Sequence, residues 1–300
     1  MEHPSPGAST GLRRRAAATA VLSLAGVTAL WLVFLRTEWG RLLGDRVYDG
    51  RSAASLRAQA LANDSLSLVT VTTLAGAGVL LLVIGLVRRR ALLGVVAVGV
   101  IGASAVSAEV LKRFVITRPP TAGEAGHLAA NWFPSGHATI CTAIGLAAVM
   151  VTPHRWRRWT AVAAALWVAF QCSGALVSGW HRPSDAVAGA LLALAWAAVG
   201  LVVLSGLDRV TPDHEEDATA RTTSVLILAT LLVAFVGIGV VVPTDAGDIE
   251  RANRTAFVVA LASIDAAGVL VVWWWWRLLA PWMLDAPRPR ARRGRNGAAG

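Results

Sequence analysis

Charged residues are scarce in this chain of 300 residues, since they make up only 15% of it while hydrophobic residues make up 55%. Soluble globular chains have about 25% charged residues and about 45–50% apolar ones. The scarcity of charge therefore excludes an ordinary soluble enzyme, and the mean hydropathy of +0.58 excludes a disordered chain. Only lipid lets so much apolar surface stay unburied by protein, so the composition predicts a polytopic membrane protein.

Cysteine and acidic residues are also few. Cys141 and Cys172, the two cysteines, both lie inside apolar runs, so we expect neither a disulfide nor a cysteine metal site. The formal net charge is +10, and the isoelectric point is near 11.4. In a soluble protein this excess would favour a nucleic-acid partner, but arginine clusters at the ends of membrane spans are typical of cytoplasmic loops. We therefore expect a lipid bilayer as the partner, and no nucleic acid.

Long uncharged runs supply the predicted spans, because a helix needs about 20 apolar residues to cross a bilayer. The runs are 16–35, 65–87, 91–108, 138–153, 160–180, 186–207, 222–243 and 255–276, the last with one acid, Asp265. The first run is too long for the apolar region of a typical signal peptide, and we interpret it as an uncleaved helix. The predicted fold class is therefore all-α, a polytopic membrane bundle of about eight transmembrane helices.

These runs divide the chain into five parts. They are a cytoplasmic N-terminal tail (1–15), a six-helix core (16–207), a cytoplasmic acidic loop (208–221), an additional transmembrane helix pair (222–279) and a basic tail (280–300). The acids of the loop, within 213–217, also fit a metal site, but a solvated loop is the stronger interpretation. We expect the basic tail to be disordered and to contact anionic lipid.

Arginine clusters predict the orientation in the membrane. They lie at 13–15, 88–90, 155–158 and 288–295. Because successive runs cross the membrane in opposite directions, all four clusters fall on one side of the membrane. The positive-inside rule predicts that this side is the cytoplasm. Both termini are then cytoplasmic. The tryptophans of 273–276 fall at the cytoplasmic interface, where we expect them to act as anchors, with substrate stacking as the alternative.

Three short polar segments lie between the runs, at 112–120, 131–139 and 178–185. The predicted topology places all three on the external side. Within them, Ser135 and Gly136 open a helix after Pro134, and the N–H groups and dipole of a helix start attract an anion. Lys112 and Arg118 supply fixed positive charge for the same anion.

Two histidines complete the predicted site. His137 and His181 are each able to act as nucleophile, acid or base near neutral pH. Asp185 follows His181 by four residues, one helical turn, and is placed to hold one imidazole nitrogen. A lone histidine at a membrane interface is usually a polar anchor, but the three segments together favour a phosphoryl-transfer site that needs neither metal nor cofactor.

These motifs resemble the type 2 phosphatidic acid phosphatase superfamily over residues 91–207. Pro-Ser-Gly-His at 134–137 and His-x-x-x-Asp at 181–185 match its motifs in full. The resemblance implies that His181, oriented by Asp185, attacks phosphorus and forms a phosphohistidine, while His137 protonates the leaving group. It also implies a six-helix core and phosphate binding by a further set of residues. They are Lys112, Arg118, Ser135 and Gly136.

The chain departs from the family pattern in two places. Five residues separate Lys112 from Arg118 where the family usually has six. The arginine that usually precedes the third-motif histidine is missing, and Gly174 and Ala175 occupy its region. Losing one such contact costs about 10²–10³ in rate. Two other cations are candidates to compensate. They are Arg113 and Arg182.

The sequence thus predicts an integral membrane phosphatase of lipid phosphates or isoprenoid diphosphates, with an extracytoplasmic site. The missing arginine favours an alternative, a lipid-phosphate-binding or carrier protein of weak activity. Asp265 suggests a third hypothesis, a transporter, because an acidic residue inside a membrane span usually has a functional role. For Asp265 itself we favour a protonated carboxyl bonded to a Ser or Thr of a neighbouring helix.

Overall fold

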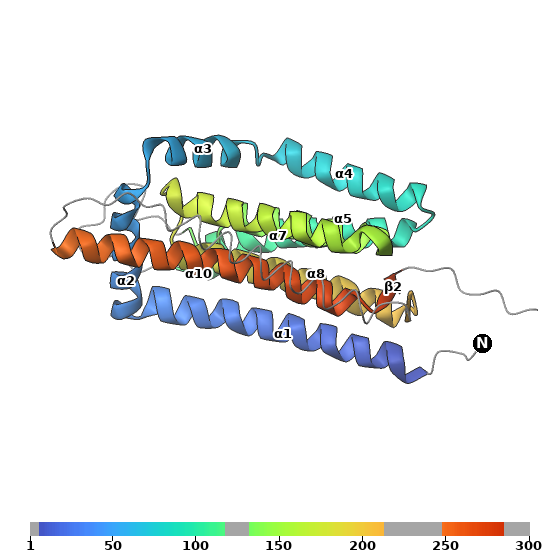
Figure 1. Ribbon diagram of the computed structural model, residues 1–300. Helices are drawn as coiled ribbons and strands as arrows, with labels where there is room; N and C mark the ends of the chain where they lie inside the picture. Colours follow the sequence, from blue (N-terminus) through green and yellow to red (C-terminus); the bar gives the residue numbers. More distant parts are fainter. Residues whose placement is uncertain (1–5, 118–131, 213–247, 285–300) are drawn as a thin grey trace, which may run out of the picture.

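The computed structural model describes residues 6–117, 132–212 and 248–284, with side chains from Ser9 onward. Its helices run side by side in an elongated bundle, and α2 lies across one end of it (Figure 1). The elements in chain order are α1 (Pro6–Arg36), α2 (Glu38–Asp49), the 3₁₀ turn η1 (Gly50–Ala53), α3 (Leu56–Ser67), α4 (Val71–Val87), α5 (Ala91–Val110), the π-helical turn η2 (Leu111–Val115), α6 (Gly136–Val151), α7 (His154–Val177), α8 (Pro183–Gly206), β1 (Val210–Pro212), α10 (Asp248–Leu279) and β2 (Trp282–Leu284).

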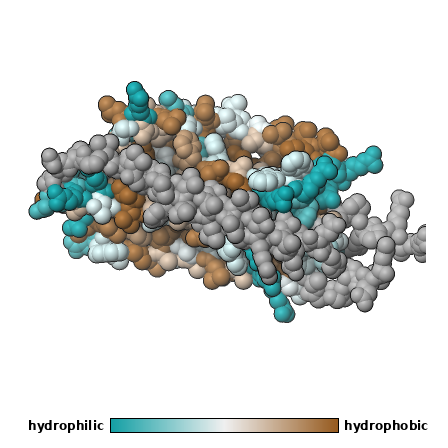
Figure 2. All heavy atoms as spheres, in the orientation of Figure 1, coloured by the Kyte–Doolittle hydropathy of each residue, from teal (hydrophilic) through white to brown (hydrophobic). Residues whose placement is uncertain are grey.

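Several helices are long and apolar enough to cross a membrane. Among the described residues, five pass this test: Ser9–Arg36, Ala91–Val115, His154–Val177, Pro183–Gly206 and Asp248–Leu279. The number of candidate spans rises to six if the bent pair of α3 and α4 is counted as one span. Helix α6 is a shorter apolar helix of 16 residues. Hydrophilic side chains gather mostly toward the two ends of the long axis (Figure 2). The predicted multi-pass helical class is confirmed, while the expected run 222–243 lies outside the described residues.

The predicted continuous span at 65–87 is wrong, because two helices meet there at an angle of 61°. Thr70 starts the second helix: its hydroxyl accepts from the Thr73 N–H, and the Thr73 hydroxyl accepts from the Thr70 N–H. This reciprocal cap ends one helix direction and fixes another. Upstream, the segment 36–64 between the first two predicted runs is mostly helical, with Thr37 and Ser55 capping α2 and α3.

Three predicted boundaries also need correction. Helix α1 begins at Pro6, so residues 6–15 of the expected tail are helical. Residues 210–212 of the expected acidic loop and residues 282–284 of the expected basic tail pair as a small antiparallel sheet, with Thr211 opposite Met283. Residues 213–221 of that loop, including its acids at 213–217, and residues 285–300 of that tail lie outside the described residues. Apart from this sheet, the regular secondary structure of the described residues is helical.

Helix α8 forms the centre of the bundle. Of its most apolar stretch, 67% is buried, against 28% for α1. It contacts α1, α5, α6 and α10, and its buried face is rich in alanine and glycine. Small residues let helix backbones approach closely where lipid offers no hydrophobic drive for association. This close packing brings the first turn of α8 against the first turn of α6.

Helix α10 is part of this core rather than an added unit, because it packs against α7, α8, α6 and α2. Trp275 and Trp276 are 0% and 1% exposed, so the expectation that they anchor the interface is wrong; Trp274, 46% exposed, fits it. The Trp275 indole donates to the carbonyl of Leu146 at 2.9 Å. Asp265 accepts a 2.6 Å hydrogen bond from the Ser173 hydroxyl of α7, which is the kind of partner that the favoured interpretation expects.

The contact between α6 and α8 gives a first prediction. A Cβ on Gly189 would lie 2.7 Å from the carbonyl oxygen of Ser135 and 2.8 Å from the Thr139 hydroxyl. Gly189→Ala is therefore expected to destabilise the protein by about 1–3 kcal/mol, the usual cost of overpacking, and to displace His137. Gly99→Ala is the control, because nothing lies within 4 Å of that Cβ. Thermal unfolding in detergent measures both, and equal melting temperatures would contradict the prediction.

Candidate active site

The three polar segments meet at one cavity of about 580 Å³. The cavity is lined by Val69, Thr70, Val71, Leu74, Glu109, Lys112, Arg113, Trp132, Gly136, His137, Ile140, Trp180 and His181. The ring centroids of His137 and His181 are 6.4 Å apart. Both predicted histidines and the predicted lysine therefore share one space, at the end of the bundle where α6 begins and α7 ends.

His181 is held in a tight turn between α7 and α8. The N–H groups of Trp180 and His181 both donate to the carbonyl of Ala175, at 3.2 and 3.0 Å. Gly179 adopts φ +73°, the left-handed conformation that commonly terminates a helix. These bonds fix the backbone of His181 independently of its side chain, so the imidazole enters the cavity from a rigid turn.

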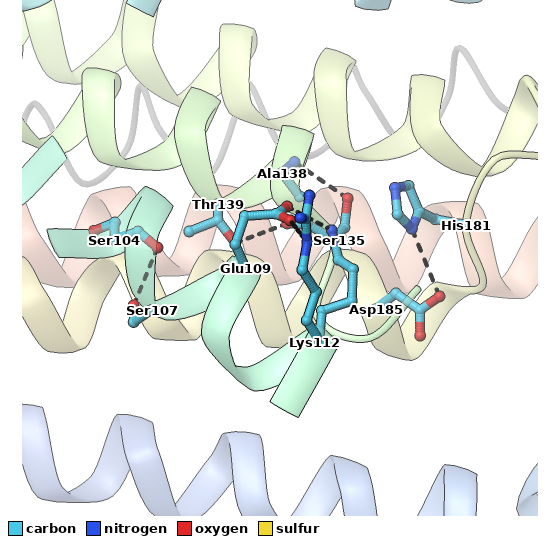
Figure 3. A network of polar contacts seen from close by, with 10 residues as sticks. Ser104, Ser107, Glu109, Lys112, Ser135, Ala138, Thr139, His181 and Asp185 are labelled. Carbon is cyan, nitrogen blue, oxygen red and sulfur yellow. Dashed lines mark hydrogen bonds and ion pairs between the residues drawn. The ribbon is translucent and has the colours of Figure 1, made fainter. Parts of the chain in front are cut away.

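Asp185 lies behind His181, on the first turn of α8. One carboxylate oxygen is 3.7 Å from Nδ1 of His181, and Nδ1 has no hydrogen-bond partner among the described residues (Figure 3). The same oxygen accepts from the Arg182 N–H at 3.1 Å, and the Ser184 hydroxyl contacts the other at 3.3 Å. The separation is longer than a hydrogen bond, yet the carboxylate faces Nδ1. That arrangement leaves Nε2 of His181 as the nitrogen available for chemistry.

The N-terminus of α6 is docked on this turn. The Ser135 N–H donates to the carbonyl of Asp185 at 2.9 Å, and the Ser135 hydroxyl accepts from the Ala138 N–H at 3.3 Å. Ser135 is therefore a buried cap that does not line the cavity, whereas Gly136 does. Nζ of Lys112 lies 3.4 Å from where a Gly136 Cβ would be. The ammonium and the positive end of α6 thus face the same volume, which suits an anion.

Glu109 is a site residue that the sequence reasoning missed. Its carboxylate binds Nζ of Lys112 at 3.0 Å and Nε of Arg113 at 2.9 Å. Lys112 and Arg113 belong to the π-helical turn η2, a geometry common at functional sites. An acid three and four residues before two cations was the available signal, because these spacings bring side chains together on a helix. Glu109 holds both cations at the rim of the cavity.

Aromatic and apolar side chains, also missed, form the rest of the wall. Trp180 packs edge-on against His137 with centroids 5.2 Å apart, and Trp132 does so against His181 at 6.1 Å. The break between α3 and α4 contributes Val69, Val71 and Leu74. The cavity therefore has a cationic side and an apolar side.

Two predicted cations are not placed in the cavity. Arg182 turns toward α2, where Nη2 and Nε bind Asp45 at 2.8 and 3.2 Å. Arg118 lies outside the described residues. Ala175, in the region of the missing arginine, is fully buried and its carbonyl holds the histidine turn. Arg113 is the one candidate substitute that lines the cavity within the described part of the chain.

Asp45 gives a second prediction, because it supports the turn through Arg182. The Arg182 side chain is only 8% exposed, and removing one partner of a buried charge is destabilising. Asp45→Asn is expected to lower kcat/KM about tenfold, or ~1.4 kcal/mol in barrier, by displacing the turn of His181. Asp49→Asn, an exposed acid on the same helix, is the control. Steady-state kinetics with a phosphate ester measures both, and equal rates would refute a role for Asp45.

The described side chains contain no group of three or more His, Cys, Asp or Glu that could hold a metal ion. The fold and cavity define a multi-pass helical membrane protein whose two histidines and two cations share one hollow. Residues 91–209, which contain all three polar segments, match the family model of the PAP2 superfamily. Members of that superfamily are generally phosphatases, and the match over this segment confirms the resemblance drawn from the motifs. Neither the curated proteins nor the solved structures compared with the chain gave a match.

Proposed function

We propose that this chain is a membrane phosphatase that hydrolyses a lipid phosphate or an isoprenoid diphosphate at the extracytoplasmic surface through a phosphohistidine intermediate. The observation that carries the proposal is the shared cavity of His137, His181 and Lys112 at the start of α6. Two titratable rings beside fixed positive charge supply a nucleophile, an acid and an anion site, which are the parts that phosphoryl transfer needs.

The proposed reaction has two steps. In the first, Nε2 of His181 bonds to phosphorus while the bond from phosphorus to the leaving oxygen breaks, and His137 donates a proton to that oxygen. In the second, water attacks phosphorus and gives its proton to His137, the N–P bond breaks, and phosphate departs. Asp185 faces Nδ1 and stabilises the positive charge on the His181 ring.

In this proposal, groups of the protein itself stabilise the negative charge on the phosphoryl oxygens. Lys112 and Arg113 lie at the cavity, and Gly136 exposes the positive end of α6 there. Because these groups meet the developing negative charge, we expect activity without an added metal ion. Vanadate, a phosphate mimic, is expected to inhibit.

The apolar wall supports a lipid substrate. Val71, Leu74 and Ile140 line the cavity on helices that belong to the membrane-embedded bundle. A phosphate headgroup is able to enter on the cationic side while its acyl or prenyl tail stays against the apolar side. A substrate held this way need never leave the bilayer.

A panel of lipid phosphates tests the proposal. The purified chain in detergent is assayed for phosphate release from diacylglycerol phosphates, isoprenoid diphosphates and sugar-linked isoprenoid phosphates, with no metal ion added. Hydrolysis of at least one class is expected. The absent third-motif arginine favours a second candidate, binding of a lipid phosphate without turnover. Binding of a panel member with no release of phosphate would select that candidate and reject the phosphatase.

A further inference from the structure

A second cavity, of about 330 Å³, lies at the opposite end of the bundle. It is lined by Arg88, Arg90, Pro153, His154, Arg155, Arg157 and Met283. Three helices run from the histidine cavity toward it, because α4 and α6 begin at the first cavity and end at the second, and α7 runs the other way. At 1.5 Å per residue, α6 is about 24 Å long and α7 about 36 Å. The two cavities are therefore separated by roughly the thickness of a bilayer core.

The second cavity is strongly cationic. Four of its seven lining residues are arginines and one is a histidine, and no Asp or Glu lines it within the described part of the chain. Carbonyl groups orient several of these side chains. Arg90 donates to the carbonyl of Leu284 at 2.6 Å, and Arg157 donates to those of Leu279 and Trp282 at 2.9 and 2.8 Å. The Leu284 carbonyl directs the Arg90 guanidinium without cancelling its charge, and each guanidinium has five N–H donors.

The positive charges in this cavity repel one another. Burial and the nearby charge of Arg90 lower the pKa of the Arg88 guanidinium from its ordinary value. Helix α7 begins at the same place, and its N-cap, Pro153, provides no side-chain cap. The positive end of the helix dipole thus adds to the arginine field. A bound anion would relieve both effects at once.

Exposed aromatic residues place this cavity at the level of lipid headgroups. Trp156 and Trp159, on the first turns of α7, are 55% and 47% exposed. Tryptophan is enriched at membrane–water interfaces, where its ring lies among the headgroups. A headgroup in the leaflet at this end is therefore beside the cavity already, whereas a soluble anion has to be recruited from water.

From this geometry we propose that the arginine cavity binds the phosphate of an anionic phospholipid of the leaflet opposite the catalytic site. Basic pockets between membrane helices bind such headgroups by charge and by bidentate hydrogen bonds. The lipid would join the link between α6 and α7 to the strand β2, because both line the cavity. This inference does not depend on the proposed function.

Thermal unfolding of the full chain in detergent, titrated with phosphatidylglycerol, tests the proposal, because a ligand of the folded state raises the melting temperature. Phosphatidylcholine and inorganic phosphate are the comparison arms. The test variant combines Arg90→Gln with Arg155→Gln, and the matched control combines Arg89→Gln with Arg14→Gln, exposed arginines that do not line the cavity. The apparent affinity for phosphatidylglycerol is expected to fall about tenfold or more in the test variant alone.

Three outcomes would overturn the proposal: equal affinity in the test and control variants, an equal shift with phosphatidylcholine, or an equal shift with inorganic phosphate. The last would show a free-phosphate site rather than a lipid site. Arg155→Gln alone is the second variant if the loss of the Arg90 bond prevents folding, because Arg155 is exposed. Lys112→Gln is expected to keep the full shift. If Lys112→Gln abolished the shift, the lipid would be binding in the catalytic cavity, and this fourth outcome would also overturn the proposal.

Discussion

His181→Ala is expected to lower kcat for the lipid substrate by at least about 10⁴-fold, a larger effect than that of any other single substitution in the cavity. The ring provides the only proposed covalent attachment point for phosphorus, and the remaining cations and helix end are able to bind substrate without cleaving it. KM is therefore expected to change little. Initial rates of phosphate release, measured beside the melting temperature, check the prediction.

Ser178→Ala is the matched control for His181, because Ser178 belongs to the same turn and its hydroxyl reaches the carbonyl of Ala175 at 3.2 Å. Its rate is expected to stay within about threefold of the parent protein, since the net value of one hydrogen bond is only about 1 kcal/mol. A His181→Ala variant that keeps full activity at an unchanged melting temperature would discard the mechanism.

His137→Ala is expected to have the second-largest effect, and its size should depend on the leaving group. With a lipid alcohol, which departs poorly unless protonated, kcat is expected to fall about 10²–10⁴-fold, the usual value of general acid catalysis. With an aryl phosphate, whose anion departs without a proton, the loss is expected to be about tenfold or less. Rates on the two substrates, measured with one preparation, give the ratio.

The same variant thus serves as its own control for folding, because both substrates use the same protein. Equal losses on the lipid and aryl substrates would mean that His137 positions the substrate rather than protonating the leaving group. The edge-on contact of Trp180 with His137 offers a way to separate these cases. Trp180→Phe keeps an aromatic wall, and is expected to change both rates by the same small factor.

The sequence predicted the convergence of the three segments because topology alone decides it. Counting the runs places three helix ends on one side of the bundle. They are the ends near Lys112 and His181 and the start at Gly136. The structure brings these residues to one cavity. Local chemistry was equally readable at Ser135, since a serine before a helical run is a standard N-cap.

Other parts depended on packing that no local pattern reveals. Arg182 follows His181 directly, which suggested a phosphate contact, but the first turn of α8 directs its guanidinium to Asp45 on α2. Helix α2 itself was missed because counting uncharged runs ignores amphipathic helices. The caps Thr37 and Ser55 were the signals available there.

The tryptophans of 273–276 show that the burial of individual side chains on a helix is not predictable from hydropathy. An aromatic run near a span end is typical of an interface, yet Trp275 and Trp276 are buried against other helices. The direction of each ring depends on the rotation of α10, which packing against α7 and α8 determines. Hydropathy alone carries no information on that rotation.

Trapping the covalent intermediate tests the central claim most directly. The purified protein is mixed with a lipid substrate labelled with ³²P in its transferable phosphate, quenched in alkali within the first turnover, and digested to locate the label. The account predicts an acid-labile, alkali-stable phosphoramidate on His181 that His181→Ala lacks. Label on another residue, or turnover of the lipid at full rate with no labelled protein at any quench time, would contradict it.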